Sequence, residues 1–220
     1  QVLANKGGMA VTLTAGNDTR LSFVTAHLEA HEGKEHYDGR CDNLSEILKG
    51  ARPGLLGGAR VGVGPNAGLV ISPKPSRGFY DATVLAHHSF VCGDLNFRVS
   101  LPEGVPGGPG TLWEGKSKKE HKAKVRQMVE REQWDELNRA DELFHALRVG
   151  DCLSGFKTPV CRFNPTFKVE RKAGFHYKDQ RTPSYTDRIL WKSVCGLQDH
   201  VRPLAYGPIA AFSTSDHKPM

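Results

Sequence analysis

The strongest constraint on the fold is the way short β-forming runs are spread along the chain among helical segments. Residues 9–14 (MAVTLT) and 21–26 (LSFVTA) suit a pleated surface, and Gly16, Asn17 and Asp18 between them are typical of a turn. This pair predicts a β-hairpin. Further strands are predicted at residues 87–92 (HHSFVC), 188–194 (RILWKSV) and 209–212 (IAAF).

Helical segments lie between these runs. Residues 42–49 predict a short helix capped by Asp42 or Asn43, residues 117–133 a charged helix, and residues 136–147 a helix that ends near Gly150. Residues 50–82 are predicted to be a Gly- and Pro-rich insertion, residues 102–115 a loop, and residues 160–169 an irregular or extended segment. The mixture predicts one layered α/β or α+β domain over residues 1–220.

Charge and cysteine content narrow the classes of partner. The 30 Lys and Arg against 24 Asp and Glu give a net charge of +6. This excess suits a phosphate ester, a nucleic acid or a membrane surface, although a solvated basic surface has the same balance. The five cysteines include no C-x-x-C pair, so a disulfide framework or zinc site is not indicated and a reducing, cytosol-facing compartment is expected. No apolar run is long enough to cross a bilayer.

The first of three polar clusters is residues 93–96 (GDLN), which follow the predicted strand at 87–92. Asp94 and Asn96 are two positions apart, so both side chains leave an extended chain on the same face. The glycine before them allows a ligand or another backbone to come close. A carboxylate there can act as a general base toward water, and an amide can donate to a phosphate oxygen. The tetrapeptide in isolation is more typical of an Asx turn that ends a strand.

The other two clusters are residues 186–188 (TDR) and 215–218 (SDHK). An Asp can orient a His by accepting a hydrogen bond from one ring nitrogen, and Asp187 and His217 could form such a pair. His27 directly follows the run at 21–26, although a lone histidine is more often structural. Each feature alone is ordinary, but three Asp-containing clusters at strand ends in a basic chain indicate a hydrolytic site.

Six segments in order resemble the motifs of the inositol polyphosphate 5-phosphatases. They are residues 5–11 (NKGGMAV), 27–31 (HLEAH), 93–98 (GDLNFR), 163–168 (FNPTFK), 181–190 (RTPSYTDRIL) and 215–219 (SDHKP). The wording of the fifth segment looks most like the ciliary, lipid-preferring member of the family. Phe167 stands where the family often has Tyr.

The resemblance implies a DNase I-like four-layer sandwich of two mixed β-sheets flanked by helices. It implies that Asp94 activates the attacking water and that Asn96, His27 and His217 contact the scissile phosphate, with Asp187 buttressing His217. Lys168 and Arg181 would grip the neighbouring ring phosphate, and Asn5 and Lys6 would lie near the phosphate that links the ring to its lipid. The implied cofactor is Mg²⁺, with Asp216 helping to organise its site. Mg²⁺ and fixed donors can neutralise charge during an in-line displacement.

The family's main magnesium ligand, a Glu in a W-x-x-x-[GA]-x-Q-E segment, has no match in these 220 residues. The chain also stops at Met220, before the strand that should follow residues 215–219 in the family. We therefore expect the domain to be truncated at both ends. Two alternatives stay open: a non-catalytic phosphoinositide-binding fragment, and a nuclease of the same superfamily, which would share the Asp94/Asn96 and Asp187/His217 arrangement. The segments around Lys168 and Arg181 favour the phosphatase.

The expected partner is a phosphoinositide lipid or a soluble inositol phosphate, with no nucleic acid. A lipid substrate implies a cytoplasmic protein that is peripheral at membranes, and the ciliary resemblance extends this expectation to the cilium or flagellum.

Overall fold

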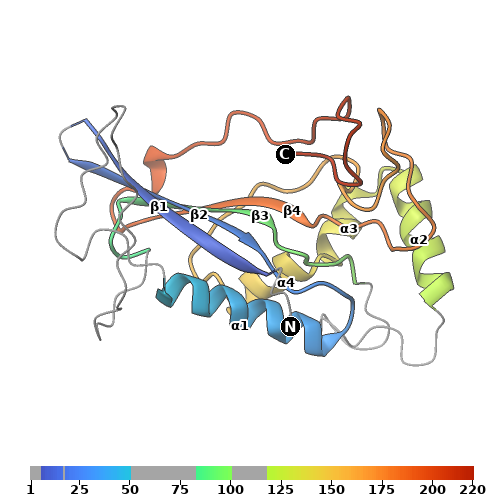
Figure 1. Cartoon of the computed structure of the whole chain (residues 1–220), viewed down its shortest axis with the longest axis horizontal. Helices are drawn as coiled ribbons and strands as arrows, with labels where there is room; N and C mark the ends of the chain where they lie inside the picture. The colour runs from blue at the N-terminus through green and yellow to red at the C-terminus, as the bar shows by residue number, and fades with distance from the viewer. Residues whose placement is uncertain (1–5, 17, 51–82, 101–117) are drawn as a thin grey trace.

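A four-stranded mixed β-sheet forms the centre of the computed structural model, which describes residues 6–16, 18–50, 83–100 and 118–220. The strands are β1 (Gly7–Ala15), β2 (Thr19–His27), β3 (His88–Asp94) and β4 (Asp187–Ser193), in the order β1-β2-β3-β4 (Figure 1). The β1–β2 and β3–β4 pairs are antiparallel, whereas β2 and β3 are parallel. The predicted hairpin and the predicted strands at 87–92 and 188–194 are confirmed.

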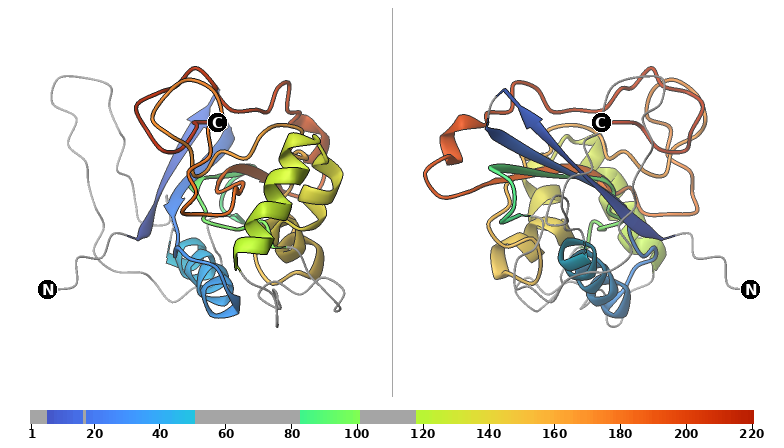
Figure 2. Two further views of the ribbon diagram at one scale, coloured as in Figure 1. Left: turned by 90° about the vertical axis from the view of Figure 1, so that its right-hand side faces the viewer. Right: turned by 60° about the vertical axis from the view of Figure 1, so that its left-hand side comes forward.

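Helices cover one face of this sheet. They are α1 (Lys34–Gly50), α2 (Lys118–Glu130), α3 (Trp134–Arg139) and α4 (Glu142–Val149), followed later by a 3₁₀ turn at Gln198–His200. In Figure 1, α1 and α4 lie on one side of the sheet and the chain after β4 runs along the other side. Helices α2 and α3 lie beyond one end of the strands in Figure 1 rather than over the face of the sheet, and the left view of Figure 2 shows them side by side. The α/β class with flanking helices is therefore confirmed.

The main hydrophobic core lies between the sheet and helix α1. Tyr37, Cys41, Leu44 and Leu48 recur at helical spacing on α1, and all four are buried. They belong to the same cluster as Val24, Val91 and Leu190 from β2, β3 and β4. Because the buried positions on these strands share one face, the packing fixes which strand residues point to the opposite face.

The opposite face of the sheet is apolar and partly open. Met9, Val11 and Leu13 of β1 and Phe23 of β2 are exposed, with Met9 at 65%. Phe23 stacks on Phe90 of β3 at 5.0 Å between ring centroids. The described residues form a single sheet, so the second sheet of the predicted sandwich stays a prediction, and this open face is where such a sheet would pack.

Three predicted elements are wrong in detail. Helix α1 begins at Lys34, eight residues before the predicted start at 42, because the buried stripe already starts at Tyr37. The predicted helix at 136–147 is two helices, since Asp141 leaves the helical conformation and its side chain accepts from the Phe144 amide to cap α4. Residues 209–212 form a turn rather than a strand, and Phe212 N bonds to Ile209 O.

Among the described residues, no helix is both long and apolar enough to cross a membrane. The predicted insertion at 50–82 lies outside the described residues except for Gly50, which ends α1, and the predicted loop at 102–115 lies outside them as well. Residues 160–169 form no regular helix or strand, as the prediction of an irregular or extended segment allows, and carry isolated bridges at Phe167 and Val169.

Candidate active site

A row of polar residues crosses three strands at one end of the sheet. His27 of β2 is the register partner of Asp94 in β3, and Asp94 is the register partner of Asp187 in β4. Register partners point to the same face, and neighbouring strands lie about 4.8 Å apart. The pairing of strands from distant parts of the chain therefore brings these three side chains together.

Gly93 makes this strand end possible. Its φ of +131° is one that residues with a side chain rarely adopt, and a Cβ placed there would lie 2.1 Å from the Ala26 carbonyl oxygen. The close approach predicted from the GDLN segment is thus to the backbone of β2. The glycine lets β3 stay paired with β2 while the chain turns and presents Asp94.

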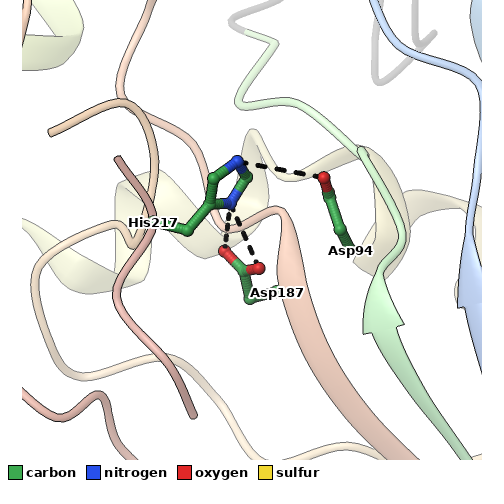
Figure 3. Close-up of side chains that lie close together, drawn as sticks. All are labelled: Asp94, Asp187 and His217. Atoms are coloured by element: carbon green, nitrogen blue, oxygen red, sulfur yellow. Dashed lines mark hydrogen bonds and ion pairs between the residues drawn. The ribbon is translucent and has the colours of Figure 1, made fainter. Parts of the chain in front are cut away.

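His217 completes the site from the C-terminal segment (Figure 3). Its Nδ1 lies 3.0 Å from Oδ2 and 3.2 Å from Oδ1 of Asp187, and its Nε2 lies 3.9 Å from Oδ2 of Asp94. Burial lowers the pKa of His217, but the hydrogen bond and charge of Asp187, with the charges of Asp94 and Asp216, outweigh it and raise the pKa. The predicted Asp187–His217 pair is present, and its free nitrogen faces Asp94.

Two threonines hold the Asp187 carboxylate in place. Thr166 Oγ1 donates to Oδ2 of Asp187 at 2.6 Å, and Thr186 Oγ1 donates to the same oxygen at 3.0 Å. Neither was assigned a role from the sequence, although both lie within the family motifs. Thr166 is far from Asp187 in the chain, so only the fold could reveal its contact.

The environment of Asp94 favours a basic carboxylate. Burial and the neighbouring charge of Asp187 raise its pKa, against the opposing charges of His217, His27 and Arg98. His27 Nε2 lies 3.4 Å from Asp94 Oδ2. Lys6 Nζ lies 2.6 Å from the same His27 nitrogen, and because an ammonium can only donate, that nitrogen accepts. Burial lowers the pKa of Lys6, although Asp94 opposes the change.

Asn96 lies directly beside Asp94, but its side chain is turned inward. It is 3% exposed, and its backbone has a φ of +56°. Its amide nitrogen donates to the Leu28 carbonyl at 3.0 Å, and its Oδ1 accepts from Arg98 Nη2 at 2.5 Å. The predicted contact of Asn96 with phosphate would have to use the second hydrogen of its amide nitrogen.

The remaining predicted residues are Lys168, Asp216, Arg181 and Asn5. Lys168 Nζ pairs with Asp216 Oδ2 at 3.5 Å. Burial raises the pKa of Asp216, but a backbone hydrogen bond, His217 and Lys168 outweigh it and lower the pKa. Arg181 is exposed. Burial lowers the pKa of His31, and the charge of Arg181 lowers it further. Asn5 lies outside the described residues.

The donor set suits a divalent cation. Within the described part of the chain, Asp94, Asp187 and His217 each offer an atom within 4.8 Å of the others, and this is the group that could hold a metal. Mg²⁺ prefers oxygen ligands and is commonly held by one or two carboxylates together with phosphate oxygens and water. Two carboxylates therefore fit the ion, and Asp216 lies outside the group.

A separate cavity of about 260 Å³ lies at the C-terminal end of α1, beside the loop after α4. Its lining includes Ser45, Lys49, Phe156 and Lys192 and none of the predicted site residues. The candidate active site is therefore defined by its convergent polar groups rather than by this cavity.

Comparison with known proteins decides the family. A model of the endonuclease/exonuclease/phosphatase family 2 matches residues 1–220. The chain belongs to this family. The predicted kinship with inositol polyphosphate 5-phosphatases is confirmed, whereas the ciliary subtype stays a prediction.

Curated members of the family resemble the chain over nearly its whole length. It is 26% identical to the type I inositol polyphosphate 5-phosphatase 2 of Arabidopsis thaliana over 226 residues, which are 99% of this chain and 28% of that protein. It is 29% identical over 227 residues to the phosphatidylinositol 3,4,5-trisphosphate 5-phosphatase 1 of Homo sapiens, covering 99% of this chain and 16% of that protein. The chain thus spans less than a third of the length of these relatives.

Solved structures confirm the fold. The inositol polyphosphate 5-phosphatase domain of synaptojanin, solved with inositol (1,4)-bisphosphate and calcium ion, aligns with a TM-score of 0.67 at 22% identity, over 99% of this chain and 49% of that one. Cimex nitrophorin, solved as a ferrous NO complex, aligns with a TM-score of 0.60 at 19% identity, over 97% of this chain and 56% of that one. Since the fold is shared by such different proteins, function has to be argued from the site.

Proposed function

We propose that the protein containing this chain hydrolyses the 5-phosphate of phosphoinositides, namely phosphatidylinositol 4,5-bisphosphate and 3,4,5-trisphosphate, or of soluble inositol polyphosphates. One observation carries this proposal: the carboxylate of Asp94 lies 3.9 Å from His217 Nε2, while the other ring nitrogen of His217 is held by Asp187. A base, an oriented imidazole and a buttressing carboxylate together are a hydrolytic arrangement.

The attacking water is activated by Asp94. A general base works best when its pKa approaches the working pH, and burial beside Asp187 moves the pKa of Asp94 in that direction. Asp94 accepts the water proton as the oxygen attacks phosphorus, the P–O bond to the inositol breaks in line, and the leaving inositol oxygen takes a proton from solvent. Thr166 and Thr186 keep Asp187 aimed at His217, so the imidazole needs no rearrangement during the reaction.

Charge that develops on the transferred phosphate is stabilised by His217 and by the Nδ1–H of His27, whose Nε2 accepts from Lys6. The remaining N–H of the Asn96 amide is a further donor. The raised pKa of His217 keeps its imidazole protonated to higher pH than an ordinary histidine. A positive donor is stronger than a neutral one toward an anionic oxygen.

The rest of the substrate is held by cationic side chains. Lys168 and Arg181 grip the neighbouring ring phosphate, and Lys6, together with Asn5, lies near the phosphate that links the ring to its lipid. Lys6 is already beside His27, within 2.6 Å of Nε2, which supports its place at the edge of the site. Such a set selects a polyanionic ring over a singly phosphorylated one.

The proposed cofactor is Mg²⁺, and Asp216 would help to organise its site, so that Asp94 stays available as the base and Asp187 as the partner of His217. When bound, the ion supplies neutralisation of the phosphate charge. The calcium ion in the synaptojanin structure supports divalent metal use.

The phosphatase is favoured over the two alternatives. Relatives at 26–29% identity carry the name 5-phosphatase, and the chain retains Asp94, Asp187 and His217 in working geometry, which a pure binding fragment does not need. We also propose that the protein works in the cytoplasm at membrane surfaces, and at the cilium, since a lipid substrate is presented there.

The test compares substrates that differ only in the 5-phosphate. Phosphate release by the full-length protein with Mg²⁺ is measured on inositol 1,4,5-trisphosphate and on inositol 1,4-bisphosphate, and on vesicles of phosphatidylinositol 4,5-bisphosphate and 4-phosphate. Release is expected only from the substrates with a 5-phosphate, and a chelator should stop it. Equal release within each pair, or cleavage of DNA alone, would overturn the proposal.

A further inference from the structure

A buried arginine, Arg98, lies between Asn96 and the Phe167 ring, which packs against the His217 imidazole. Arg98 is 3% exposed and follows β3 by four residues. Its Nη2 donates to Asn96 Oδ1 at 2.5 Å, and its guanidinium carbon lies 5.0 Å from the centre of the Phe167 ring. The Phe167 ring in turn lies 4.6 Å from the His217 imidazole, tilted by 37°. The Arg98 guanidinium thus contacts both Asn96, two residues after the base Asp94, and the Phe167 ring that packs against the His217 imidazole.

This arrangement is costly to the fold. Arg98 Nε and Nη1 are buried and have no hydrogen-bond partner among the described residues. Burial lowers the pKa of Arg98 to about 10, and Arg40 adds to the decrease, while Asp94, Glu32 and Glu142 oppose it. Buried donors without partners cost stability, and violations of this kind gather at functional sites.

We propose that Arg98 is a positioning residue for the reaction: its guanidinium fixes the Asn96 amide on one side and, through the Phe167 ring, the His217 imidazole on the other. This inference rests on the proposed phosphatase function. Arg98 does not itself touch the substrate in this account.

The hydrogen bonds of Asn96 explain the first half of this role. Arg98 is only a donor, so it selects the oxygen of the Asn96 amide, and the Leu28 carbonyl is only an acceptor, so it selects the nitrogen. The amide cannot flip without losing both bonds. Its second N–H therefore has one fixed direction.

The second half depends on a stack. A cation above an aromatic face is attracted to it, and Phe167 has no hydroxyl that could anchor the ring in another way. Phe167 is also tied by backbone bridges to Ser184 and to His217. In the proposed role, Arg98 holds the Phe167 ring in place, and the ring in turn holds the His217 imidazole.

The test uses Arg98→Met, which keeps an unbranched stem but removes charge and donors, and Arg98→Lys, which restores the charge. Arg139→Met is the matched control, because Arg139 is exposed on α3 and pairs only loosely with Glu136 at 3.8 Å. For the full-length protein, Arg98→Met should lower kcat about 100-fold with KM nearly unchanged, since misplaced groups cost about that much. The kcat of Arg98→Lys should be about tenfold higher than that of Arg98→Met.

A double-mutant cycle with Phe167→Leu tests the route. If Arg98 acts through the ring, the double variant should lose about tenfold less kcat than the product of the two single losses. The positioning role would be overturned if the kcat loss of the double variant equalled the product of the two single losses. It would also be overturned if Arg98→Met left kcat unchanged, or if Arg98→Met and Arg98→Lys lost kcat equally. If Arg98→Met does not fold, the same cycle is run with Arg98→Lys.

An activity-independent readout separates this inference from the proposed function. The imidazole nitrogen NMR signals of His217 should shift in Arg98→Met and in Phe167→Leu but not in Arg139→Met. If the wild-type protein releases no phosphate yet these shifts occur, the proposed function fails and the positioning stands. If phosphate is released but the His217 signals stay unchanged, the positioning fails alone.

Discussion

The buried ion pair between Arg188 and Asp141 should be the most sensitive point of the fold behind the site. Arg188 Nη1 lies 2.8 Å from Asp141 Oδ1, and both side chains are 0% exposed. Burial raises the pKa of Asp141. Burial alone would lower the pKa of Arg188, but the charge of Asp141 outweighs this effect, so the pKa of Arg188 is raised. Arg188 stays protonated, and its charge together with the hydrogen bonds from Arg188 and the Phe144 amide favours the ionised form of Asp141 against burial.

The informative change is Asp141→Asn. It removes the charge and keeps an oxygen that can still accept from the Phe144 amide at the start of α4. Leaving one buried charge without its partner costs about 3–5 kcal/mol, compared with a total stability of about 5–15 kcal/mol. Asp141→Ala should cost about 1 kcal/mol more because the helix cap is lost as well.

The assay is urea unfolding at neutral pH followed by far-UV circular dichroism. With a slope of about 2 kcal/mol per molar urea, a loss of about 4 kcal/mol moves the midpoint down by about 2 M. Asp141→Asn combined with Arg188→Met should recover most of this loss, because the double variant leaves no unpaired buried charge. Asp135→Asn is the surface control, because its pair with Arg162 is exposed at 3.5 Å and should contribute less than about 1 kcal/mol. A midpoint for Asp141→Asn within the range of the surface control would refute the reasoning.

Three further predictions concern the site itself. Gly93→Ala should destabilise the chain by about 3 kcal/mol in the same unfolding assay, because its Cβ would meet the Ala26 carbonyl oxygen at 2.1 Å; a loss below about 1 kcal/mol would contradict this. Thr166→Val should lower kcat about tenfold with an unchanged KM in steady-state phosphate release, since it removes one hydrogen bond to a charged carboxylate; an effect on KM alone would argue against this role. His217 has a raised folded pKa, so the stability it contributes is complete below pH 6.5 and is lost as pH rises through the folded value above 6.5. In metal-free buffer, the stability difference between wild type and His217→Gln should therefore shrink with rising pH, and a difference that grows would show the sign to be wrong.

The sheet could be predicted from the sequence because its strands carry strong local signals. The hairpin follows from two β-forming runs around Gly16, and β3 and β4 follow from apolar runs next to polar clusters. Helix α1 was predicted to begin too late because Asp42 and Asn43 look like caps in isolation. In the folded chain, packing of Tyr37 and Cys41 against the sheet outweighs that local signal.

The members of the site could be predicted, whereas their contacts could not. The motif residues Asp94, Asp187 and His217 do come together, as the sequence suggested. The support from Thr166 and the link from Arg98 through Phe167 join segments that are far apart in the chain. Such contacts depend on strand register and on the path of the C-terminal segment, neither of which a local pattern encodes.

In the proposed reaction, Asp94 activates the water that attacks the 5-phosphate. The most direct measurement is phosphate release from inositol 1,4,5-trisphosphate by wild type and Asp94→Asn of the full-length protein, with Asp38→Asn as a control on the exposed face of α1. We expect Asp94→Asn to lose turnover by a factor of about 100 or more while unfolding at the same urea concentration, and Asp38→Asn to match wild type. Turnover by Asp94→Asn equal to that of wild type would contradict the account.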